Sequence, residues 1–190
     1  MKQAMMIAAT LALVAIPGLS AAQSKASVAP DKVVYDAASA MAFFKSLTGD
    51  WQSAAAGHEH GDAPAANGTV RTFRTKANGS AVVETIGAGT KNEMETILHM
   101  NGDKLLLTHY CALQNAPVLR FEKSSKPGEI KFVFEGGTNF DPKVDAHFHE
   151  GSFQVKDKDT IEQTTTVFTN GKASPESHSV LKRKQTSSSQ

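Results

Sequence analysis

The sequence predicts an all-β protein, an antiparallel up-and-down barrel of about ten strands with one N-terminal helix. From residue 50 onwards apolar and polar residues alternate with period two, which is typical of strands with one buried face. Turn sequences such as Asn78-Gly79, Asn101-Gly102 and Asn170-Gly171 separate these segments at short intervals. Closing so long a sheet into a barrel removes its two edges. A sandwich is the alternative, although its longer Greek-key connections fit the short links less well.

Residues 1–22 have the composition of a secretory signal peptide. Lys2 precedes an apolar run from Met5 to Ile16, and the small residues Ser20-Ala21-Ala22 then suit a signal peptidase. The apolar run is shorter than the ~20 residues that a membrane span needs, so no integral membrane segment is expected. These features predict a periplasmic or secreted protein.

One helix is expected before the first strand. Asp36 can cap its N-terminus, and Gly49 suits its end. Apolar residues at helical spacing lie between them, at Ala37, Ala40, Met41, Phe44 and Leu47. We expect this helix to close one end of the barrel.

The chain after the signal peptide divides into three parts. A flexible leader is expected at 23–35, the barrel domain at 36–184 and a disordered tail at 185–190. The expected strands of the domain are 50–55, 68–77, 80–86, 92–100, 103–112, 116–123, 129–136, 146–156, 159–169 and 174–184.

The hairpin around Asn101-Gly102 indicates which side chains face the interior. If these two residues form a type I′ turn, Leu98 pairs with Leu105 and Met94 with His109. The inner face then carries Met94, Thr96, Leu98, Met100, Asp103, Leu105, Leu107, His109 and Cys111. The opposite face collects most of the charged residues, as the solvent side of an antiparallel sheet does.

A hairpin around Asn78-Gly79 places Arg71 and Glu84 diagonally on the face that carries Phe73. If that face is the inner one, the two side chains form a buried ion pair. An ordinary surface pair is the equally weighted alternative, because the opposite face carries the apolar residues Val70 and Val83.

Histidines give two weak candidate metal sites. His147 and His149 project from one side of a strand, and a structural or cavity-lining role is favoured over a metal there. The hairpin around Asp157-Lys158 is expected to place them on one face with Phe153, Val155, Thr164, Thr166 and Phe168. In the loop after the first strand, His58, His60 and Asp62 could bind Zn²⁺ or Cu²⁺. A flexible polar loop is the favoured interpretation, since a metal site needs ligands held rigidly by surrounding residues.

Charge and cysteine content exclude other classes. Without Lys2, the only charged residue of the first 22, the 19 remaining basic residues equal the 19 acidic ones. Nucleic-acid binding therefore lacks the basic surface that drives it. Because Cys111 is the only cysteine, no intramolecular disulfide can form.

No motif predicts catalysis. His109 and Cys111 point the same way, but no oxyanion hole can be identified beside them, so a buried inert thiol is favoured over a nucleophile. The sequence contains no Gly-x-Ser-x-Gly, phosphate-binding loop, dinucleotide fingerprint or His-Glu-x-x-His. An enzyme acting on a bound small molecule is kept as an alternative.

The segment Leu107-Thr108-His109-Tyr110-Cys111-Ala112, followed by Asn115-Ala116-Pro117, resembles secreted bacterial lipocalin-like proteins of uncharacterised function. The likeness continues at Leu47–Trp51, Gly79–Thr85 and His147-Phe148-His149. The chain departs from that pattern at Gln114, Ala116, Thr160 and Thr165. The resemblance implies a calycin-type barrel without an established reaction, and it adds Asn115 to the candidate ligand-binding residues.

A more distant resemblance is to nitrobindin-type ten-strand barrels, which hold haem through a histidine near the C-terminus. His178 is the only histidine of the last expected strand, but the Gly-x-Trp-x-Gly-x-Gly motif is missing after Gly49-Asp50-Trp51. Haem is therefore an alternative, and no cofactor is predicted.

Together these observations predict an extracytoplasmic protein that binds a small apolar or amphipathic molecule inside a barrel. The candidate ligand-binding residues are Arg71, Glu84, Met94, His109, Cys111, Asn115, His147 and His149. The alternatives are a metal- or haem-binding barrel that uses its histidines, and an enzyme acting on a molecule bound in the barrel.

Overall fold

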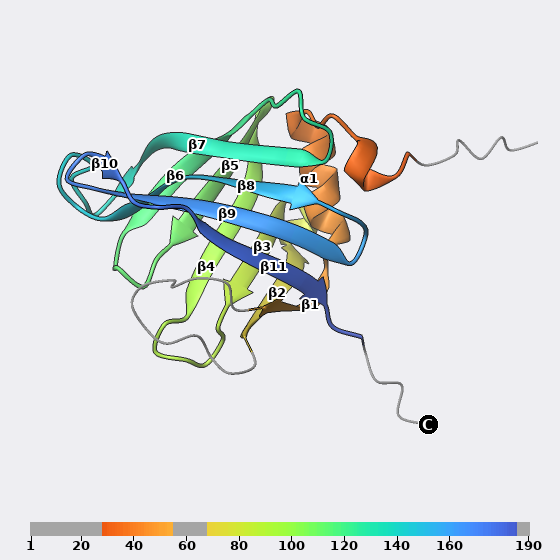
Figure 1. Cartoon of the computed structure of the whole chain (residues 1–190), viewed down its shortest axis with the longest axis horizontal. Coiled ribbons are helices and arrows are strands. Elements are labelled where there is room, and N and C mark those ends of the chain that lie inside the picture. The colour runs from red at the N-terminus through yellow and green to blue at the C-terminus, as the bar shows by residue number, and fades with distance from the viewer. Residues whose placement is uncertain (1–27, 55–67, 186–190) are drawn as a thin grey trace, which may run out of the picture.

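The computed structural model describes residues 28–54 and 68–185. Within them the chain forms a closed ten-strand antiparallel barrel with one α-helix, which confirms the predicted fold class (Figure 1). The elements are η1 (Pro30–Lys32), α1 (Ala37–Ser46), β1 (Gly49–Ala54), β2 (Thr69–Lys76), η2 (Ala77–Gly79), β3 (Ala81–Ile86), β4 (Met94–Asn101), β5 (Lys104–Tyr110), β6 (Ala116–Glu122), β7 (Glu129–Thr138), β8 (His147–Val155), β9 (Thr160–Thr169), β10 (Lys172–Ala173) and β11 (Ser177–Arg183).

The strands pair with their neighbours in the chain from β1 to β9, and β11 then pairs with both β9 and β1. The two-residue strand β10 pairs only with β9, so it lies outside the closed ring. Within the described ranges no helix is both long and apolar enough to cross a membrane.

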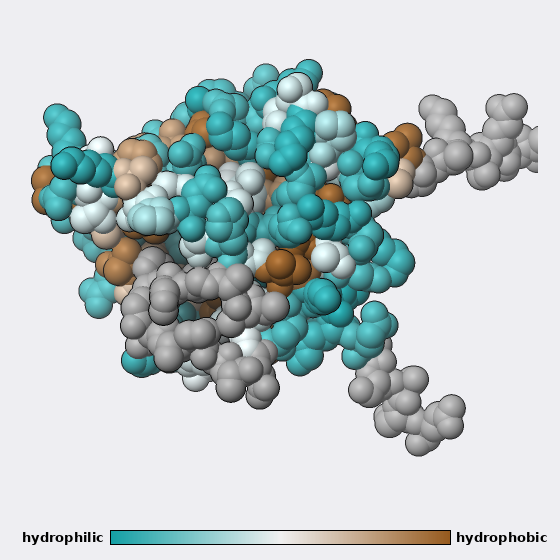
Figure 2. All heavy atoms as spheres, in the orientation of Figure 1, coloured by the Kyte–Doolittle hydropathy of each residue, from teal (hydrophilic) through white to brown (hydrophobic). Residues whose placement is uncertain are grey.

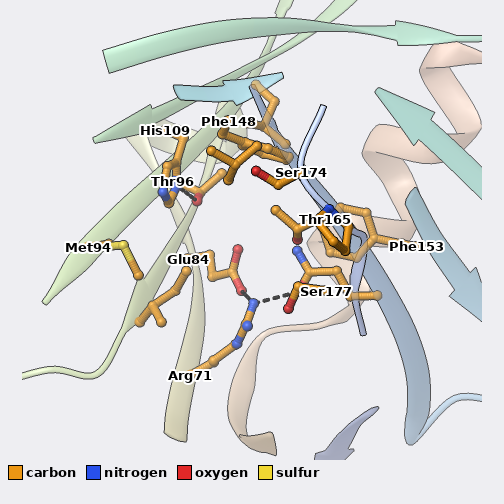
Figure 3. Close-up of a pocket in the computed structure, with 15 residues that line it drawn as sticks. Arg71, Glu84, Met94, Thr96, His109, Phe148, Phe153, Thr165, Ser174 and Ser177 are labelled. Carbon is orange, nitrogen blue, oxygen red and sulfur yellow. Dashed lines mark hydrogen bonds and ion pairs between the residues drawn. The ribbon is translucent and has the colours of Figure 1, made fainter. Parts of the chain in front are cut away.

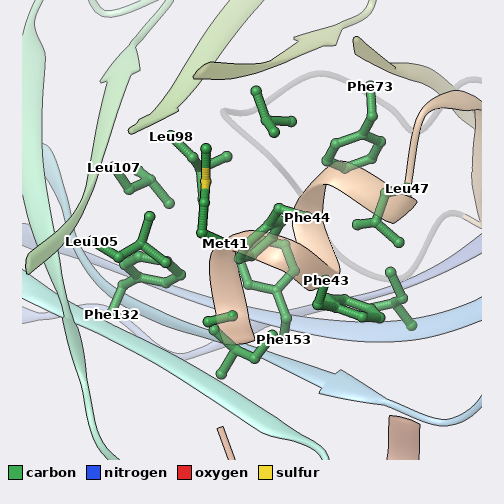
Figure 4. Close-up of a cluster of buried hydrophobic side chains, with 14 of the residues drawn as sticks. Met41, Phe43, Phe44, Leu47, Phe73, Leu98, Leu105, Leu107, Phe132 and Phe153 are labelled. Atoms are coloured by element: carbon green, nitrogen blue, oxygen red, sulfur yellow. The ribbon is translucent and has the colours of Figure 1, made fainter. Parts of the chain in front are cut away.

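The helix α1 fills one end of the barrel. Asp36 and Ser39 form a reciprocal capping box at its N-terminus. Phe44 projects inward to meet Phe132 and Phe153, with ring centroids 6.0 and 5.1 Å apart (Figure 4). These contacts continue into one apolar cluster that occupies this half of the interior. The structure therefore supports the expected role of the helix as the closure of one end.

The helix ends earlier than Gly49. Its last residue is Ser46, its C-cap is Leu47, and Gly49 begins β1 with a φ of 137°. A Cβ at this position would lie 3.1 Å from Nη1 of Arg183. Glycine is therefore favoured here by the backbone conformation, and an added Cβ would also crowd the end of the Arg183 side chain.

The outer surface follows from the alternation along the strands. Figure 2 shows a face covered mainly by hydrophilic residues, with apolar ones scattered among them. The large apolar side chains that are exposed in the described chain are Val28, Val34, Val70, Tyr110, Leu113 and Val144. Scattered exposure of this kind is normal for a folded domain.

The β4–β5 hairpin turns at Gly102-Asp103 and not at Asn101-Gly102. Leu98 consequently pairs with Leu107, and Thr96 with His109. The expected pairing was thus wrong by two residues. A shift of two leaves every strand side chain on its original face, so most of the expected inner residues are buried. The exceptions are Met100, which is half-buried, and Asp103, which lies in the turn and is exposed.

The β8–β9 hairpin has a larger correction. Its loop contains three residues, because Lys156 donates its backbone N–H to the Thr160 carbonyl at 3.0 Å. The Asp159 amide bonds to the side chain of Asp157 at 2.7 Å inside this loop. The extra residue changes the facing of β9, so that Phe153 pairs with Gln163. The expectation that Thr164, Thr166 and Phe168 share the face of Phe153 and Val155 was therefore wrong.

The end of the expected leader is ordered against the barrel. Tyr35 is buried and donates its hydroxyl to the Pro30 carbonyl at 3.1 Å. The Val33 carbonyl accepts the Gly128 amide at 2.8 Å. The packed structure therefore starts before residue 36. The expected signal peptide lies outside the described residues, as do most of the expected tail and the first part of the leader.

Arg183 fastens the closing strand β11 to the helix and to β1. Its guanidinium lies 4.4 Å from the centre of the Trp51 ring. It also donates to the carbonyls of Leu47 and Thr48 at the C-terminus of α1, and to Asp159 at 2.9 Å. A cation at this end of a helix is favourably placed in the field of the helix dipole.

We expect Arg183→Met to lower the free energy of unfolding by about 2 kcal/mol, because it removes hydrogen bonds from a charged donor and a cation–π contact. Urea unfolding followed by far-ultraviolet circular dichroism measures this loss. Lys182→Met is the control, because Lys182 is exposed and should change stability by less than about 0.5 kcal/mol. Equal effects of the two variants would contradict the assigned role.

Candidate functional site

The barrel interior holds a cavity of about 300 Å³ beyond the apolar cluster that packs on α1 (Figure 3). Along β2 the inward side chain changes from Phe73 in that cluster to Arg71 at the cavity, and along β4 it changes from Leu98 to Thr96. The cavity is lined by Arg71, Glu84, Ile86, Met94, Thr96, Leu107, His109, Phe148, Phe153, Gln163, Thr165, Val167, Ser174, Pro175 and Ser177.

Five of these side chains are polar and buried, and we call them the polar belt. They come from five strands and are Arg71, Glu84, Thr96, His109 and Gln163. The sheet register places three of them in one row, because Glu84 pairs directly with Thr96, and Thr96 pairs with His109. The belt therefore separates the apolar core from the outer part of the cavity.

Arg71 is the centre of the belt. Its Nη1 atom lies 3.1 Å from Oε1 of Glu84 and donates to Oε1 of Gln163 at 2.6 Å. The side chains of Arg71 and Glu84 are only 1% and 2% exposed. The predicted ion pair is thus buried, which decides against a surface pair. Two charges this far from water keep their ionised forms only because each compensates the other.

The second polar contact of the belt joins β4 to β5. Nδ1 of His109 lies 2.9 Å from the Thr96 hydroxyl, and the His109 ring meets Phe148 edge-on at 5.6 Å. The direct pairing of Thr96 with His109 in the sheet explains this contact. An imidazole held in this way presents a fixed polar edge near the cavity.

The rest of the wall is mainly apolar. Ile86 and Met94 lie beyond the belt on β3 and β4, and Phe148 and Val167 lie on β8 and β9. Apart from Thr96 of the belt, the residues with hydroxyl groups are Thr165, Ser174 and Ser177, which lie across the cavity from Met94 in Figure 3. Apolar walls with a few placed polar groups are typical of small-molecule sites.

Four of the eight predicted site residues line this cavity: Arg71, Glu84, Met94 and His109. Cys111 is buried beside Ile86 and Met94, but it lines a second, more open pocket. Asn115 also lies in that second pocket, where its side chain donates to the Ala146 carbonyl at 2.8 Å. Cys111 and Asn115 therefore lie outside the main cavity, in the turn between β5 and β6, where the Cys111 amide donates to the Asn115 carbonyl at 3.0 Å.

His147 and His149 do not line the cavity either. A bulge between Phe148 and Glu150 turns Phe148 to the cavity and leaves the two histidines in a separate aromatic cluster. The His149 ring stacks on Phe134 and Phe168, with centroids 4.7 and 3.8 Å away. The expectation of two cavity-lining histidines was wrong, because a strand with a bulge does not alternate regularly.

The two histidines are hydrogen-bonded to each other. Nδ1 of His147 lies 2.9 Å from the Asp145 carbonyl, which can only accept, so this nitrogen carries a proton. Nε2 of His147 lies 3.0 Å from Nδ1 of His149. In the neutral pair, His149 is therefore the donor. No cluster of three or more potential metal ligands occurs among residues 28–54 and 68–185, and His58, His60 and Asp62 lie outside these ranges.

His178 points away from the cavity. Its side chain is 64% exposed, and Nε2 lies 3.6 Å from a carboxylate oxygen of Glu176. The inward residues of this strand include its neighbour Ser179 and Leu181, which are buried. A haem ligand inside the barrel would have to come from another position.

Sequence reasoning missed Gln163, which is the second partner of Arg71. The prediction failed because it assumed a two-residue loop between β8 and β9, which would turn Gln163 outward, whereas the loop has three residues. Asp157 carries the relevant signal, because an aspartate that bonds an amide two residues ahead favours a wider turn. Thr96 was correctly placed on the inner face but was not selected as a site residue.

Comparison of the chain with models of known protein families gives no match, and comparison with curated proteins gives none either.

We expect Gln163→Leu to reduce the free energy of unfolding by about 2 kcal/mol, because the buried Arg71 guanidinium loses an acceptor at 2.6 Å. Urea titration provides the measurement. Glu162→Gln is the matched control at the preceding residue, whose side chain is 49% exposed and pairs with Lys156. A loss no larger than that of the control would show that Gln163 contributes little to the belt.

The stability of the fold should depend on pH through His149. Burial, and then the neighbouring His147, lower the pKa of the His149 imidazole below its ordinary value. The unfolded chain therefore binds a proton more readily than the folded one, so stability should fall as the pH drops below about 6.5. Melting temperatures between about pH 8 and pH 5.5 test this expectation.

His149→Gln should make the acid-induced fall in melting temperature smaller. His178→Gln is the control, because His178 is exposed and lies outside the aromatic cluster. If His149→Gln retained the full pH dependence, another group would be responsible for it.

Proposed function

We propose that this protein binds a small, mostly apolar molecule in the barrel cavity and acts outside the cytoplasm. The observation that carries the proposal is the cavity itself, about 300 Å³ in volume, between a packed apolar core and a wall of Ile86, Met94, Phe148 and Val167. Its volume is at the lower end of the range for small-molecule pockets. The ligand is therefore a compact molecule.

The polar belt supports a binding role because burying these groups costs free energy. Isolated charges and unpaired polar groups are expensive to remove from water, and a well-packed apolar layer would avoid that expense. The barrel instead places Arg71, Glu84 and His109 beside a cavity. Such groups orient a bound molecule and distinguish it from others of similar size.

The proposed location follows from the first 22 residues, whose charge, apolar run and small residues fit an export signal. The presence of a single cysteine, Cys111, is compatible with an oxidising compartment, because no wrong disulfide can form within the chain.

We expect the mature protein to bind the neutral dye N-phenyl-1-naphthylamine, with increased dye fluorescence and a higher melting temperature. Saturation at a hundredfold excess over Kd should stabilise the fold by about 2.7 kcal/mol through linkage. Met94→Arg should abolish binding, because it places a further charge at the cavity wall.

His99→Gln is the matched control for Met94→Arg. His99 lies on β4 as well, and it pairs with Ala81 and Leu106 on the outer face of the sheet. It should bind the dye like the unmodified protein. Circular dichroism establishes that both variants are folded. Unchanged dye binding by a folded Met94→Arg variant would refute the cavity as the site.

A further inference from the structure

We propose that the cavity selects an electrically neutral ligand with a hydrogen-bonding group, and that the Arg71–Glu84 pair sets this selection. The inference rests on the proposed function, since it names the class of molecule that the cavity takes. It concerns the charge of the ligand, which the size and the apolar walls of the cavity do not determine.

The charge balance of the cavity carries the argument. Among the described residues that line it, the ionisable groups are Arg71, Glu84 and His109. Arg71 and Glu84 carry opposite charges 3.1 Å apart, and both side chains are almost completely buried. The pair therefore contributes no net charge for a ligand to neutralise.

An ion in the cavity would disturb this balance. A carboxylate bound by Arg71 would bring a second negative charge next to Glu84. An ammonium bound by Glu84 would bring a second positive charge next to Arg71. In a site removed from water, an uncompensated charge is expensive. The ionic forms of a ligand should therefore bind more weakly than a neutral form of the same shape.

The cavity nevertheless offers partners for a neutral polar group. Hydroxyl groups of Thr165, Ser174 and Ser177 line one side, and the Gln163 amide lies next to Arg71. Hydroxyl groups donate and accept, so they suit an alcohol, a carbonyl or an amide equally well. The remaining walls fit an apolar body. A primary alcohol with an alkyl chain represents this class.

The test compares three probes with the same chain length: decanol, decanoate and decylamine. Each competes with bound N-phenyl-1-naphthylamine on the mature protein at about pH 8, where imidazoles are ordinarily neutral while both ionic probes keep their charge. We expect decanol to bind more tightly than either ion by a factor of about ten or more, because neither ion finds an unmatched counter-charge.

Two variants test the role of the pair. Glu84→Gln removes the negative charge and should shift the preference towards decanoate, by a factor of about ten relative to decanol. Arg71→Gln removes the positive charge and should shift it towards decylamine. The double variant with both substitutions has no charge imbalance and should again prefer decanol. His99→Gln, on the outer face, should preserve the original order.

Breaking a buried ion pair by removing one partner is strongly destabilising, so competition at room temperature is replaced by melting curves at low temperature for a single variant that is only marginally folded. The melting temperature with each probe is then the measurement. Decanoate should raise it for Glu84→Gln, and decylamine should raise it for Arg71→Gln, each more than the other two probes do. The unmodified protein and the double variant remain available for competition in any case.

The outcomes separate the two proposals. If neither the dye nor any of the three probes binds, the proposed function fails. If the dye binds but decanoate or decylamine equals decanol in the unmodified protein, only the neutral-ligand inference fails. If decanol is preferred but the single variants show no shift in preference, the Arg71–Glu84 pair does not set the selection.

Discussion

The pairing of β11 with β1 is the constraint on which the barrel depends, because it joins the two ends of a sheet that would otherwise have open edges. Arg183 holds this seam. It lies opposite Trp51 in the register, covers its ring and binds carbonyl groups at the end of α1. The seam, the helix and the β8–β9 loop are thereby fixed by one side chain. Arg183 therefore links closure of the barrel to the packing of the helix at its end.

Closure also creates the cavity. A helix with four buried apolar side chains fills only the end of a ten-strand barrel, and the apolar cluster around it reaches the cavity at Leu107, Phe148 and Phe153. The remaining space cannot collapse, since hydrogen bonds around the ring fix the distance between opposite walls. Side chains at this level are therefore free to be polar, provided that they compensate one another as Arg71, Glu84 and Gln163 do.

The sequence was sufficient for the fold because alternation and turn residues are local signals. The inner face of β4 and β5 was predicted despite a turn placed wrongly by one position, since the resulting register error of two preserves facing. Gln163 and His149 were misplaced for the opposite reason. One extra loop residue and one bulge each shift the register by one residue, which turns the side chains to the other face of the sheet. Both depend on contacts between strands that no single segment encodes.

The buried ion pair is difficult to explain by stability alone. Apolar residues of similar volume are often as stable as a buried pair or more stable, and the neighbouring core already consists of such residues. Next to the cavity, the same pair has a further consequence in our proposal: its balanced charges favour a neutral ligand over a charged one. The same Nη1 atom of Arg71 also donates to Gln163, so a turn of Arg71 towards an incoming anion would break this hydrogen bond as well. In the proposed selection, the hydrogen bonds that tie Arg71 to both Glu84 and Gln163 therefore matter as much as the balance of charge.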